Sequence, residues 1–439
     1  MRHIVVLAAF LCAGSQFAHA DAVTPPDTLR LSMEEALTLA LARNVSTLTA
    51  REAVIGQAAA RNEARAVFLP TLSASGSYSD TWGEEDGGLP DGGDAALGAS
   101  ITGSLTLWNG GGRMADLARQ TAALHRAEAS LRQAQQSALR STIDAYLTLV
   151  ESLHSLDIAE QSLSLAMATS EQTTGLLNAG RATVSDVLRA DVTVAQQRTA
   201  LVRSRNDVTT ARRVLSDLLG GPFVVVVPVE PEFEPSLLLA TPLPEGVEES
   251  SPSVAIAEAS VTQARATTRG QKSRFLPRLN ASATSSWSEH GGEFGEPDRR
   301  GSLAVSWSLF EGGARCFALQ GAQAAERSAR WDLQDTRRQV KSDLEQAWID
   351  MRAAEAQWDA AMQTVALAED SHAQETELYT LGRSTSLEVL SALDTLNESR
   401  REEIASRYQI LRAYAQLRAV RGTLEATMFK GSSLCPEMK

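Results

Sequence analysis

The second half of the chain repeats the first half, and this duplication limits the folds open to it. Between Leu107 and Gly220, residues match those found 202 positions later in the chain. Leu107 thus corresponds to Leu309, and Gly220 to Gly422. The paired patterns are Phe-Leu-Pro-x-Leu at 68–72 and 275–279, Gly-Gly-x-Arg at 110–113 and 312–315, Gly-Arg at 180–181 and 382–383, and Val-Leu at 187–188 and 389–390. A period this long indicates that a whole structural half has been duplicated, and it does not fit a solenoid of short repeats.

Each half is predicted to contain a short Ala-rich helix, two strands, a very long helix and a returning helix. The helices are expected at Met33–Phe68, Arg113–Asn178, Thr183–Leu219, Ser253–Phe275, Arg315–Leu381 and Ser384–Leu424. A proline follows each short helix and ends it, because proline disfavours helical geometry in the residue before it. The long helices, of about 67 residues at ~1.5 Å each, span roughly 100 Å, whereas a bilayer core is about 30 Å thick. They must therefore stand in water beside the membrane.

The strand-like segments before each long helix alternate with period two. They are expected at Thr71–Trp82, Leu97–Leu107, Leu279–Ser288 and Ser302–Leu309, with Trp82, Trp108, Trp287 and Trp307 in or beside them. One face of each segment is largely apolar and the other is mainly serine and threonine, which is typical of transmembrane barrel strands of about 10 residues. Aromatic girdles at the membrane interface explain the tryptophans. A soluble sandwich also alternates, but a small polar face is a poor sandwich core.

The number of strands points to an oligomer. Four strands cannot close a barrel, and lipid tolerates no open sheet edge. The chain must therefore pool its strands with copies of itself. Two copies give eight strands, whose interior is filled by side chains, whereas three copies give twelve, which can enclose a pore. The small serine and threonine faces favour the open arrangement.

The N-terminus has the three parts of a secretory signal peptide. A basic start, Met1–His3, precedes the apolar run Ile4–Cys12, and Ala18–Ala20 supplies a small-x-small cleavage site before Asp21. Leu11, directly before Cys12, is too large for lipoprotein processing. We therefore expect cleavage after residue 20 and no lipid anchor.

Composition and motifs exclude several classes of function. A net charge of −13 argues against a nucleic-acid partner. After the signal peptide no run of 18 apolar residues occurs, which argues against an α-helical inner-membrane protein. Cys316 and Cys435 are too few for a disulfide framework or a metal site. The sequence lacks HExxH, CxxC and Gly-rich phosphate-loop motifs, so we expect no enzymatic activity, no cofactor and no bound metal.

The duplicated Phe-Leu-Pro-x-Leu segments, Gly-Gly-x-Arg helix starts and Gly-Arg-x-x-x-x-(Asp/Glu)-Val-Leu turns together resemble the TolC family of outer-membrane efflux proteins. The resemblance covers nearly all of the chain after residue 20. It implies a mainly α fold with a transmembrane β-barrel: a homotrimer whose twelve-stranded barrel, four strands per chain, continues into a long periplasmic tunnel of coiled-coil-like helices. It also implies an outer-membrane location in contact with lipid, and docking onto a periplasmic adaptor and an inner-membrane pump for efflux or type I secretion.

The duplication divides the chain into predicted segments. These are the signal peptide at 1–20, a first repeat at 21–220 with strands at about 71–107, an equatorial linker at 221–251, a second repeat at 252–424 with strands at about 278–310, and a tail at 425–439. The linker carries Val224–Val227 and many prolines. We expect it to lie at mid-height as a belt around the helices.

The two helix-reversal turns carry the candidate functional residues. Gly180 and Gly382 suit the positive φ of a turn. By the family resemblance, these glycines and the arginines after them, Arg181 and Arg383, are also expected to contact the adaptor.

An acid follows each turn, Asp186 or Glu388, three residues after Thr183 or Thr385. This spacing predicts a capping box at the start of each returning helix. The resemblance gives a second interpretation, in which Asp186 and Glu388 line a closed periplasmic entrance and attract cations. The sequence leaves both interpretations open.

The lock of that entrance matches the family in part. Tyr379 falls on the tyrosine of the family's entrance. Arg383 lies one residue from the arginine that locks the entrance in the family, and Ser391 stands where some members have a further aspartate.

Two alternative functions remain for the chain: a passive porin or envelope protein without a pump partner, and a periplasmic adaptor. Porins lack helices of this length, and adaptors lack two pairs of barrel-like strands.

Overall fold

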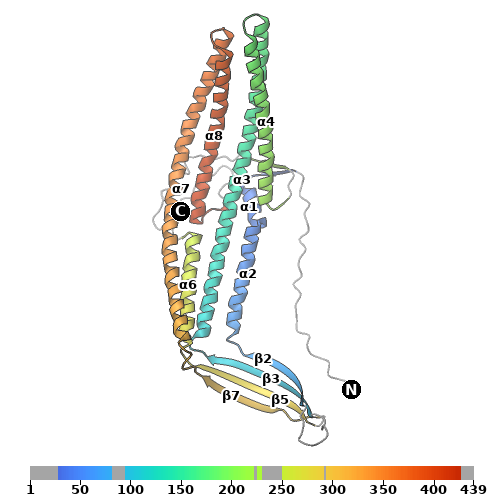
Figure 1. The fold of residues 1–439 in the computed structure, drawn as a ribbon, viewed down its shortest axis with the longest axis vertical. Helices are drawn as coiled ribbons and strands as arrows, with labels where there is room; N and C mark the ends of the chain where they lie inside the picture. Colours follow the sequence, from blue (N-terminus) through green and yellow to red (C-terminus); the bar gives the residue numbers. More distant parts are fainter. Residues whose placement is uncertain (1–27, 82–93, 222–224, 230–249, 291–292, 427–439) are drawn as a thin grey trace.

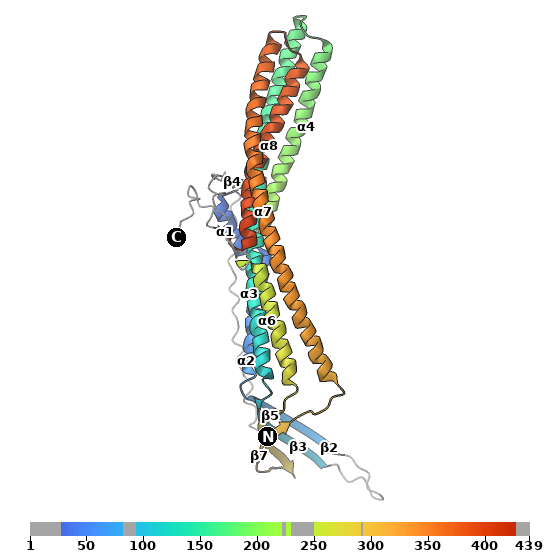
Figure 2. The same cartoon turned by 90° about the vertical axis from the view of Figure 1, so that its left-hand side faces the viewer.

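The computed structural model describes residues 28–81, 94–221, 225–229, 250–290 and 293–426. The molecule is elongated, with long helices at one end and a curved sheet at the other (Figures 1 and 2). The predicted signal peptide, Trp82, Cys435, most of the linker and most of the tail lie outside the described residues.

Two long helical hairpins make up the end of the molecule away from the sheet (Figure 1). The helices are α1 (Met33–Arg43), α2 (Val45–Ala66), α3 (Gly112–Asn178), α4 (Val184–Leu218), α6 (Pro252–Ser273), α7 (Ala314–Thr380) and α8 (Ser386–Arg421). One hairpin is α3 packed along α4, and the other is α7 packed along α8. Toward the sheet, α2, α3, α6 and α7 pack in that order. None of the described helices is both long and apolar enough to cross a membrane.

The long helices α3 and α7 have 67 residues each, which corresponds to about 100 Å. Each follows a glycine with a positive φ, Gly111 at 84° and Gly313 at 85°. Residues with a Cβ rarely adopt this backbone conformation, which explains the Gly-Gly step before each helix. The observed ends of α3 and α7 lie within one residue of the predicted ends.

The single helix predicted at Met33–Phe68 is wrong, because the chain forms two helices that meet at Asn44. The backbone of Asn44 is extended, and its side-chain oxygen accepts a hydrogen bond from the Ser46 N–H at 3.0 Å. This is an N-cap, which ends α1 and starts α2. The break lets α1 join the mid-height core, while α2 packs along α3 toward the sheet.

Four antiparallel strands form the sheet, in the order β2-β3-β5-β7. Their bounds are β2 (Thr71–Thr81), β3 (Asp94–Trp108), β5 (Arg278–His290) and β7 (Asp298–Ser306), and the short β6 (Glu293–Phe294) pairs with the end of β5. The register places hydroxyl side chains opposite one another across all four strands. We call this side of the sheet the hydroxyl face, and its paired hydroxyl side chains are Thr71, Ser73, Ser75, Ser100, Thr102, Ser104, Ser282, Thr284, Ser286 and Ser302.

Hydrogen bonds between side chains run across the hydroxyl face. The oxygen–oxygen distance is 2.8 Å between Ser75 and Ser100, and 3.2 Å between Thr102 and Thr284. The other side of the sheet, the apolar face, carries Leu72, Ala74, Tyr78, Leu97, Ile101, Leu105, Ala281, Ala283, Trp287, Leu303 and Val305. In a single chain this face is open, with Leu72 79% and Val305 71% exposed. A single chain therefore exposes an apolar surface that another molecule must cover.

The strand predicted at Ser302–Leu309 is displaced, because β7 ends at Ser306. Ser306 is the partner of Arg278, so the next residue of β7 faces Pro277, which has no N–H to donate. The Trp307 indole instead donates a hydrogen bond to the Phe275 carbonyl at 3.1 Å. The predicted second strand pair at about 278–310 therefore ends earlier than expected.

The main core lies at mid-height, where α1, α3, α4 and α8 meet. Its largest fully buried side chains include Tyr146, Leu215 and Tyr408. Beside it, β1 (Thr28–Leu31) pairs in parallel with β4 (Val225–Pro228), a pairing that we did not predict. The Tyr146 hydroxyl lies 2.6 Å from the Val229 carbonyl and 3.0 Å from the Leu31 carbonyl, and so joins both segments to α3.

Candidate functional site

The two helix-reversal turns have the same backbone conformation. Gly180 and Gly382 each have φ of +72°. The next N–H groups, of Arg181 and Arg383, donate to helical carbonyls five residues earlier, at 2.8 and 2.9 Å. This hydrogen-bonded helix ending requires a positive φ, which glycine adopts without strain. The Gly-Arg pattern is therefore explained by the turn itself.

Asp186 closes the start of α4 in a capping box with Thr183. Its carboxylate accepts hydrogen bonds from the Thr183 N–H at 2.9 Å and the Thr183 hydroxyl at 2.7 Å, and the same hydroxyl accepts from the Asp186 N–H at 3.3 Å. The Thr183 side chain first, and its backbone next, hold the pKa of Asp186 below its ordinary value. The carboxyl group of Asp186 therefore stays ionised to a lower pH than that of an ordinary aspartate.

Glu388 closes the start of α8 in the same way. Its carboxylate accepts from the Thr385 N–H at 2.7 Å and from the Ser384 hydroxyl at 2.8 Å. The bond from the Thr385 backbone is the main cause that lowers the pKa of Glu388. The predicted capping boxes are thus both confirmed.

The second turn holds an additional acid that the sequence did not indicate. Ser384 lies 2.6 Å from a carboxylate oxygen of Glu375 as well as contacting Glu388. Glu375 belongs to the preceding helix, α7, and no local spacing motif links it to the turn. Only the folded hairpin brings Glu375 and Ser384 together.

The two hairpins of one chain touch near their turns. The Tyr379 hydroxyl, on α7, lies 3.1 Å from the Thr173 hydroxyl on α3, and both side chains are buried. The Ser386 hydroxyl donates to the Asp186 carboxylate at 3.3 Å. Tyr379 and Asp186 therefore both contribute to holding the hairpins side by side.

The arginines of the turns, Arg181 and Arg383, are both exposed. Arg181 reaches the other turn, because its Nη2 lies 3.3 Å from where a Cβ on Gly382 would stand. Among the described residues, Arg383 forms no ion pair. The structure thus brings Asp186, Tyr379 and Arg181 into contact with the neighbouring hairpin.

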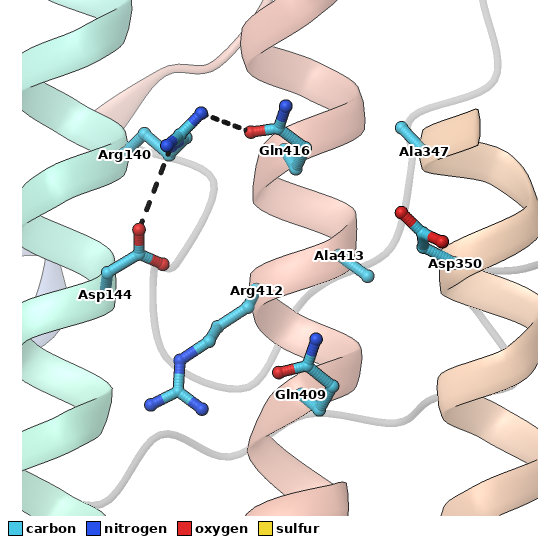
Figure 3. A pocket seen from close by; sticks show the side chains of 8 residues that line it. All are labelled: Arg140, Asp144, Ala347, Asp350, Gln409, Arg412, Ala413 and Gln416. Atoms are coloured by element: carbon cyan, nitrogen blue, oxygen red, sulfur yellow. Dashed lines mark hydrogen bonds and ion pairs between the residues drawn. The ribbon is translucent and has the colours of Figure 1, made fainter. Parts of the chain in front are cut away.

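Farther from the turns, polar contacts join the hairpins at mid-height. Figure 3 shows a polar groove between α3, α7 and α8. Its Arg140 donates to Gln416 at 2.6 Å, and Arg412 forms two bonds to Glu151, at 2.7 and 2.8 Å. Burial raises the pKa of Asp144 here, and Arg140 opposes that rise. These contacts fix α8 against α3.

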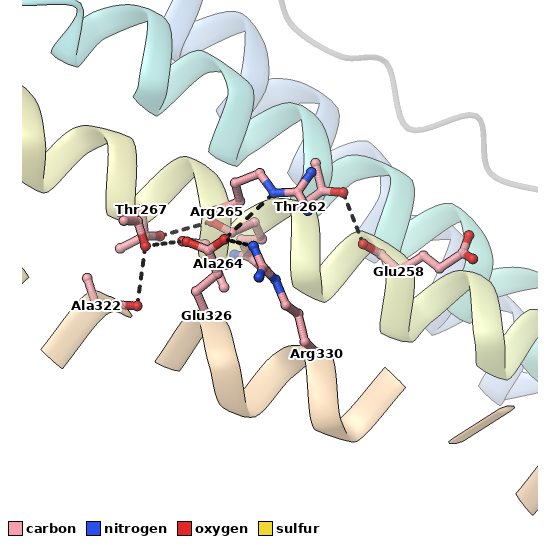
Figure 4. A network of polar contacts seen from close by, with 10 residues as sticks. Glu258, Thr262, Ala264, Arg265, Thr267, Ala322, Glu326 and Arg330 are labelled. Carbon is pink, nitrogen blue, oxygen red and sulfur yellow. Dashed lines mark hydrogen bonds and ion pairs between the residues drawn. The ribbon is translucent and has the colours of Figure 1, made fainter. Parts of the chain in front are cut away.

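A second polar network joins α6 to α7 (Figure 4). Glu326 of α7, with a side chain only 14% exposed, accepts from Arg330 at 2.5 Å and lies 3.7 Å from Arg265 of α6. A hydrogen bond from Thr268 is the main cause that lowers the pKa of Glu326, against the effect of burial. The network fixes the spacing of two helices that lead to the sheet.

The junction between helices and sheet explains the duplicated motifs. The Arg113 guanidinium lies 4.8 Å from the centre of the Phe68 ring and donates to the Val67 carbonyl at 3.3 Å. Arg315 repeats this arrangement with Phe275. In both halves the arginine of Gly-Gly-x-Arg contacts the phenylalanine of Phe-Leu-Pro and bonds the carbonyl that ends the short helix. Distant motifs therefore form one contact in each half.

Comparison with known proteins agrees with this architecture. The sequence model of a family described as outer membrane efflux protein matches residues 36–221 and 243–423. The chain is 23% identical over 385 residues to the outer membrane protein TolC of Escherichia coli (strain K12), covering 83% of this chain and 76% of that protein. It is 24% identical over 347 residues to protein CyaE of Bordetella pertussis, covering 77% and 73%.

Solved structures of outer-membrane proteins share the fold of the chain. The crystal structure of the outer membrane protein VceC from Vibrio cholerae superposes with a TM-score of 0.78 at 19% identity, covering 89% of this chain and 96% of that one. At this identity the likeness concerns the fold alone.

Proposed function

The chain belongs to the outer membrane efflux protein family, and we propose that three copies assemble around one axis to form its channel. It is an outer-membrane channel that serves efflux or type I secretion, with its helical part in the periplasm.

The two unpaired edges of the described sheet support the proposed trimer. Among the described strands, β2 pairs only with β3, and β7 pairs only with β5. The four strands alternate in direction, so β2 and β7 run antiparallel to each other. β7 of one copy can therefore pair with β2 of the next and continue the antiparallel pattern. Such pairing satisfies the N–H and C=O groups of both edges, which lipid does not tolerate unpaired.

Three copies fit the two faces of the sheet. With the apolar face outward, Leu72, Ile101 and Val305 contact lipid, and the hydroxyl face surrounds water. Eight strands would leave an interior packed with side chains, whereas twelve enclose an aqueous pore. Small hydroxyl side chains line a pore better than they fill a core. The long helices of the three copies then continue the pore as a tunnel.

We propose that the hairpin ends are both the entrance and the docking site. Three copies place Asp186 and Glu388 around one axis, where a ring of carboxylates favours cations. Tyr379 sets the spacing of the hairpins around that entrance. The exposed Arg181 and Arg383, together with the glycine turns, form the contact surface for a periplasmic adaptor that connects to an inner-membrane pump.

Photo-crosslinking in the native host tests the docking surface. A photoreactive amino acid replaces Arg383 in one variant, and Arg126, exposed on the sheet end of α3, in a matched control. We expect the first variant to capture a periplasmic adaptor and the control to capture none. Equal capture from both positions, or none from the turn, contradicts docking at the hairpin ends.

A further inference from the structure

The register of β7 places two opposite charges on the hydroxyl face. Arg300 stands opposite Thr284, which stands opposite Thr102. Asp298 stands opposite Ser286, in the next row of the same face. Arg300 and Asp298 are therefore neighbours on one side of the strand, because successive side chains point to opposite faces.

The two charges contact each other in water. Arg300 Nη2 lies 3.5 Å from Asp298 Oδ2, and the side chains are 79% and 69% exposed. An ion pair this exposed contributes little to stability. Among the side chains that the structure describes on the hydroxyl face of the four strands, one other is charged, Arg278 at the helix end of β5. The pair is therefore a local charged zone on an otherwise uncharged part of the face.

Arg299, between the two, belongs to the other side of the sheet. It stands opposite Ser285, which stands opposite Ile101 on the apolar face. The chain thus offers two adjacent arginines on opposite faces. This arrangement supplies an internal control for any role of Arg300.

We propose that Asp298 and Arg300 form a charge-paired girdle inside the barrel that sets the ionic preference of the outer part of the channel. The inference rests on the proposed trimer, which places three pairs around one lumen. Arg300 disfavours cations and Asp298 disfavours anions, and their pairing keeps the lumen close to neutral at this level. Arg300 lies six residues from the end of β7, about 20 Å along the strand from the tunnel. The girdle is therefore separate from the carboxylates of the periplasmic entrance.

Reversal potentials in planar bilayers, under a salt gradient, test the girdle. Arg300→Gln leaves three unpaired carboxylates and is expected to raise the cation-to-anion permeability ratio about twofold or more at 0.1 M salt. Asp298→Asn leaves three unpaired guanidinium groups and is expected to lower the ratio by a similar factor. Both shifts shrink at 1 M salt, because the Debye length falls to about 3 Å. Arg300→Lys keeps the charge and the wild-type ratio.

The matched control is Arg299→Gln, which removes the same charge from the apolar face. It is expected to leave the permeability ratio unchanged, while the oligomer of each variant resists detergent as the wild type does. Unchanged ratios in both Arg300→Gln and Asp298→Asn, or equal shifts in Arg299→Gln and Arg300→Gln, overturn the girdle and leave the proposed channel intact. A wild-type protein that forms no channel refutes the proposed function and the girdle with it.

Discussion

Removing the hydroxyl of Tyr146 should loosen the mid-height core at one defined point. Tyr146 is fully buried on α3, and its hydroxyl contacts two segments distant in sequence. It lies 2.6 Å from the Val229 carbonyl and accepts from the Val229 N–H at 2.9 Å. Tyr146→Phe keeps the ring and removes these contacts.

The magnitude follows from which groups lose a partner. The Val229 N–H keeps a second bond, to the Leu31 carbonyl at 3.1 Å, whereas the Val229 carbonyl loses its hydroxyl donor. The hydroxyl has one proton, which serves one of the two carbonyls at a time, so the substitution removes one donated and one accepted bond. Two lost bonds at about 0.5–1.5 kcal/mol each predict a decrease of about 1–3 kcal/mol in the free energy of unfolding per chain. Thermal unfolding of the detergent-solubilised protein measures the difference. Tyr78→Phe is the control, because Tyr78 is 67% exposed on the sheet.

The same hydroxyl predicts a pH dependence. Burial raises the pKa of Tyr146 from its ordinary value of 10.0 to about 12, with the bond to Val229 opposing that rise. The folded pKa exceeds the unfolded one, so the stabilisation is fully present below pH 10 and is lost as the pH rises toward 12. The stability gap between wild type and Tyr146→Phe should close over that interval. A gap that is absent at pH 8, or that equals the effect of Tyr78→Phe, refutes the role given to the hydroxyl.

Three further predictions concern the entrance, the thiols and the junction. Replacing Asp186 by Asn and Glu388 by Gln together removes the charge but keeps side-chain acceptors for the caps. The double variant should show weaker cation selectivity in single-channel recordings, with little change in thermal stability. Unchanged selectivity would leave both residues as helix caps alone. Cys316 is exposed at the sheet end of α7, and we expect no disulfide between it and Cys435. Both thiols should therefore react with a thiol label under non-reducing denaturation. Labelling that appears only after reduction would contradict the expected free thiols. Arg113→Gln removes the stacking on Phe68 and the bond to the Val67 carbonyl at the end of α2, and should cost about 1–2 kcal/mol of unfolding free energy. An unchanged unfolding midpoint would exclude this loss.

Local sequence patterns were sufficient for the parts of the fold that depend on local rules. The ends of α3 and α7 follow from the Gly-Gly steps and Gly-Arg turns, and both capping boxes follow from the spacing of Thr183 and Thr385 from their acids. The break at Asn44 is not predictable in this way, because the alanine-rich sequence on both sides favours one continuous helix and a single capping residue is a weak signal.

Contacts between distant segments were not predictable from these rules. The parallel pairing of β1 with β4 joins a short segment near the start of the first repeat to one in the linker and has no local signal. The contact of Tyr379 with Thr173, and that of Ser386 with Asp186, depends on the relative height of two separate hairpins. The end of β7 depends on Pro277, just before β5, standing opposite the residue that follows Ser306, and therefore on register.

The number of chains in the purified protein tests the proposed assembly most directly. Native mass measurement in detergent should give three chains, because four strands per chain with two open edges require partners, and twelve strands enclose a pore. Strand β7 of each copy then pairs with β2 of the next. A stable monomer that retains full barrel character would contradict the proposed assembly.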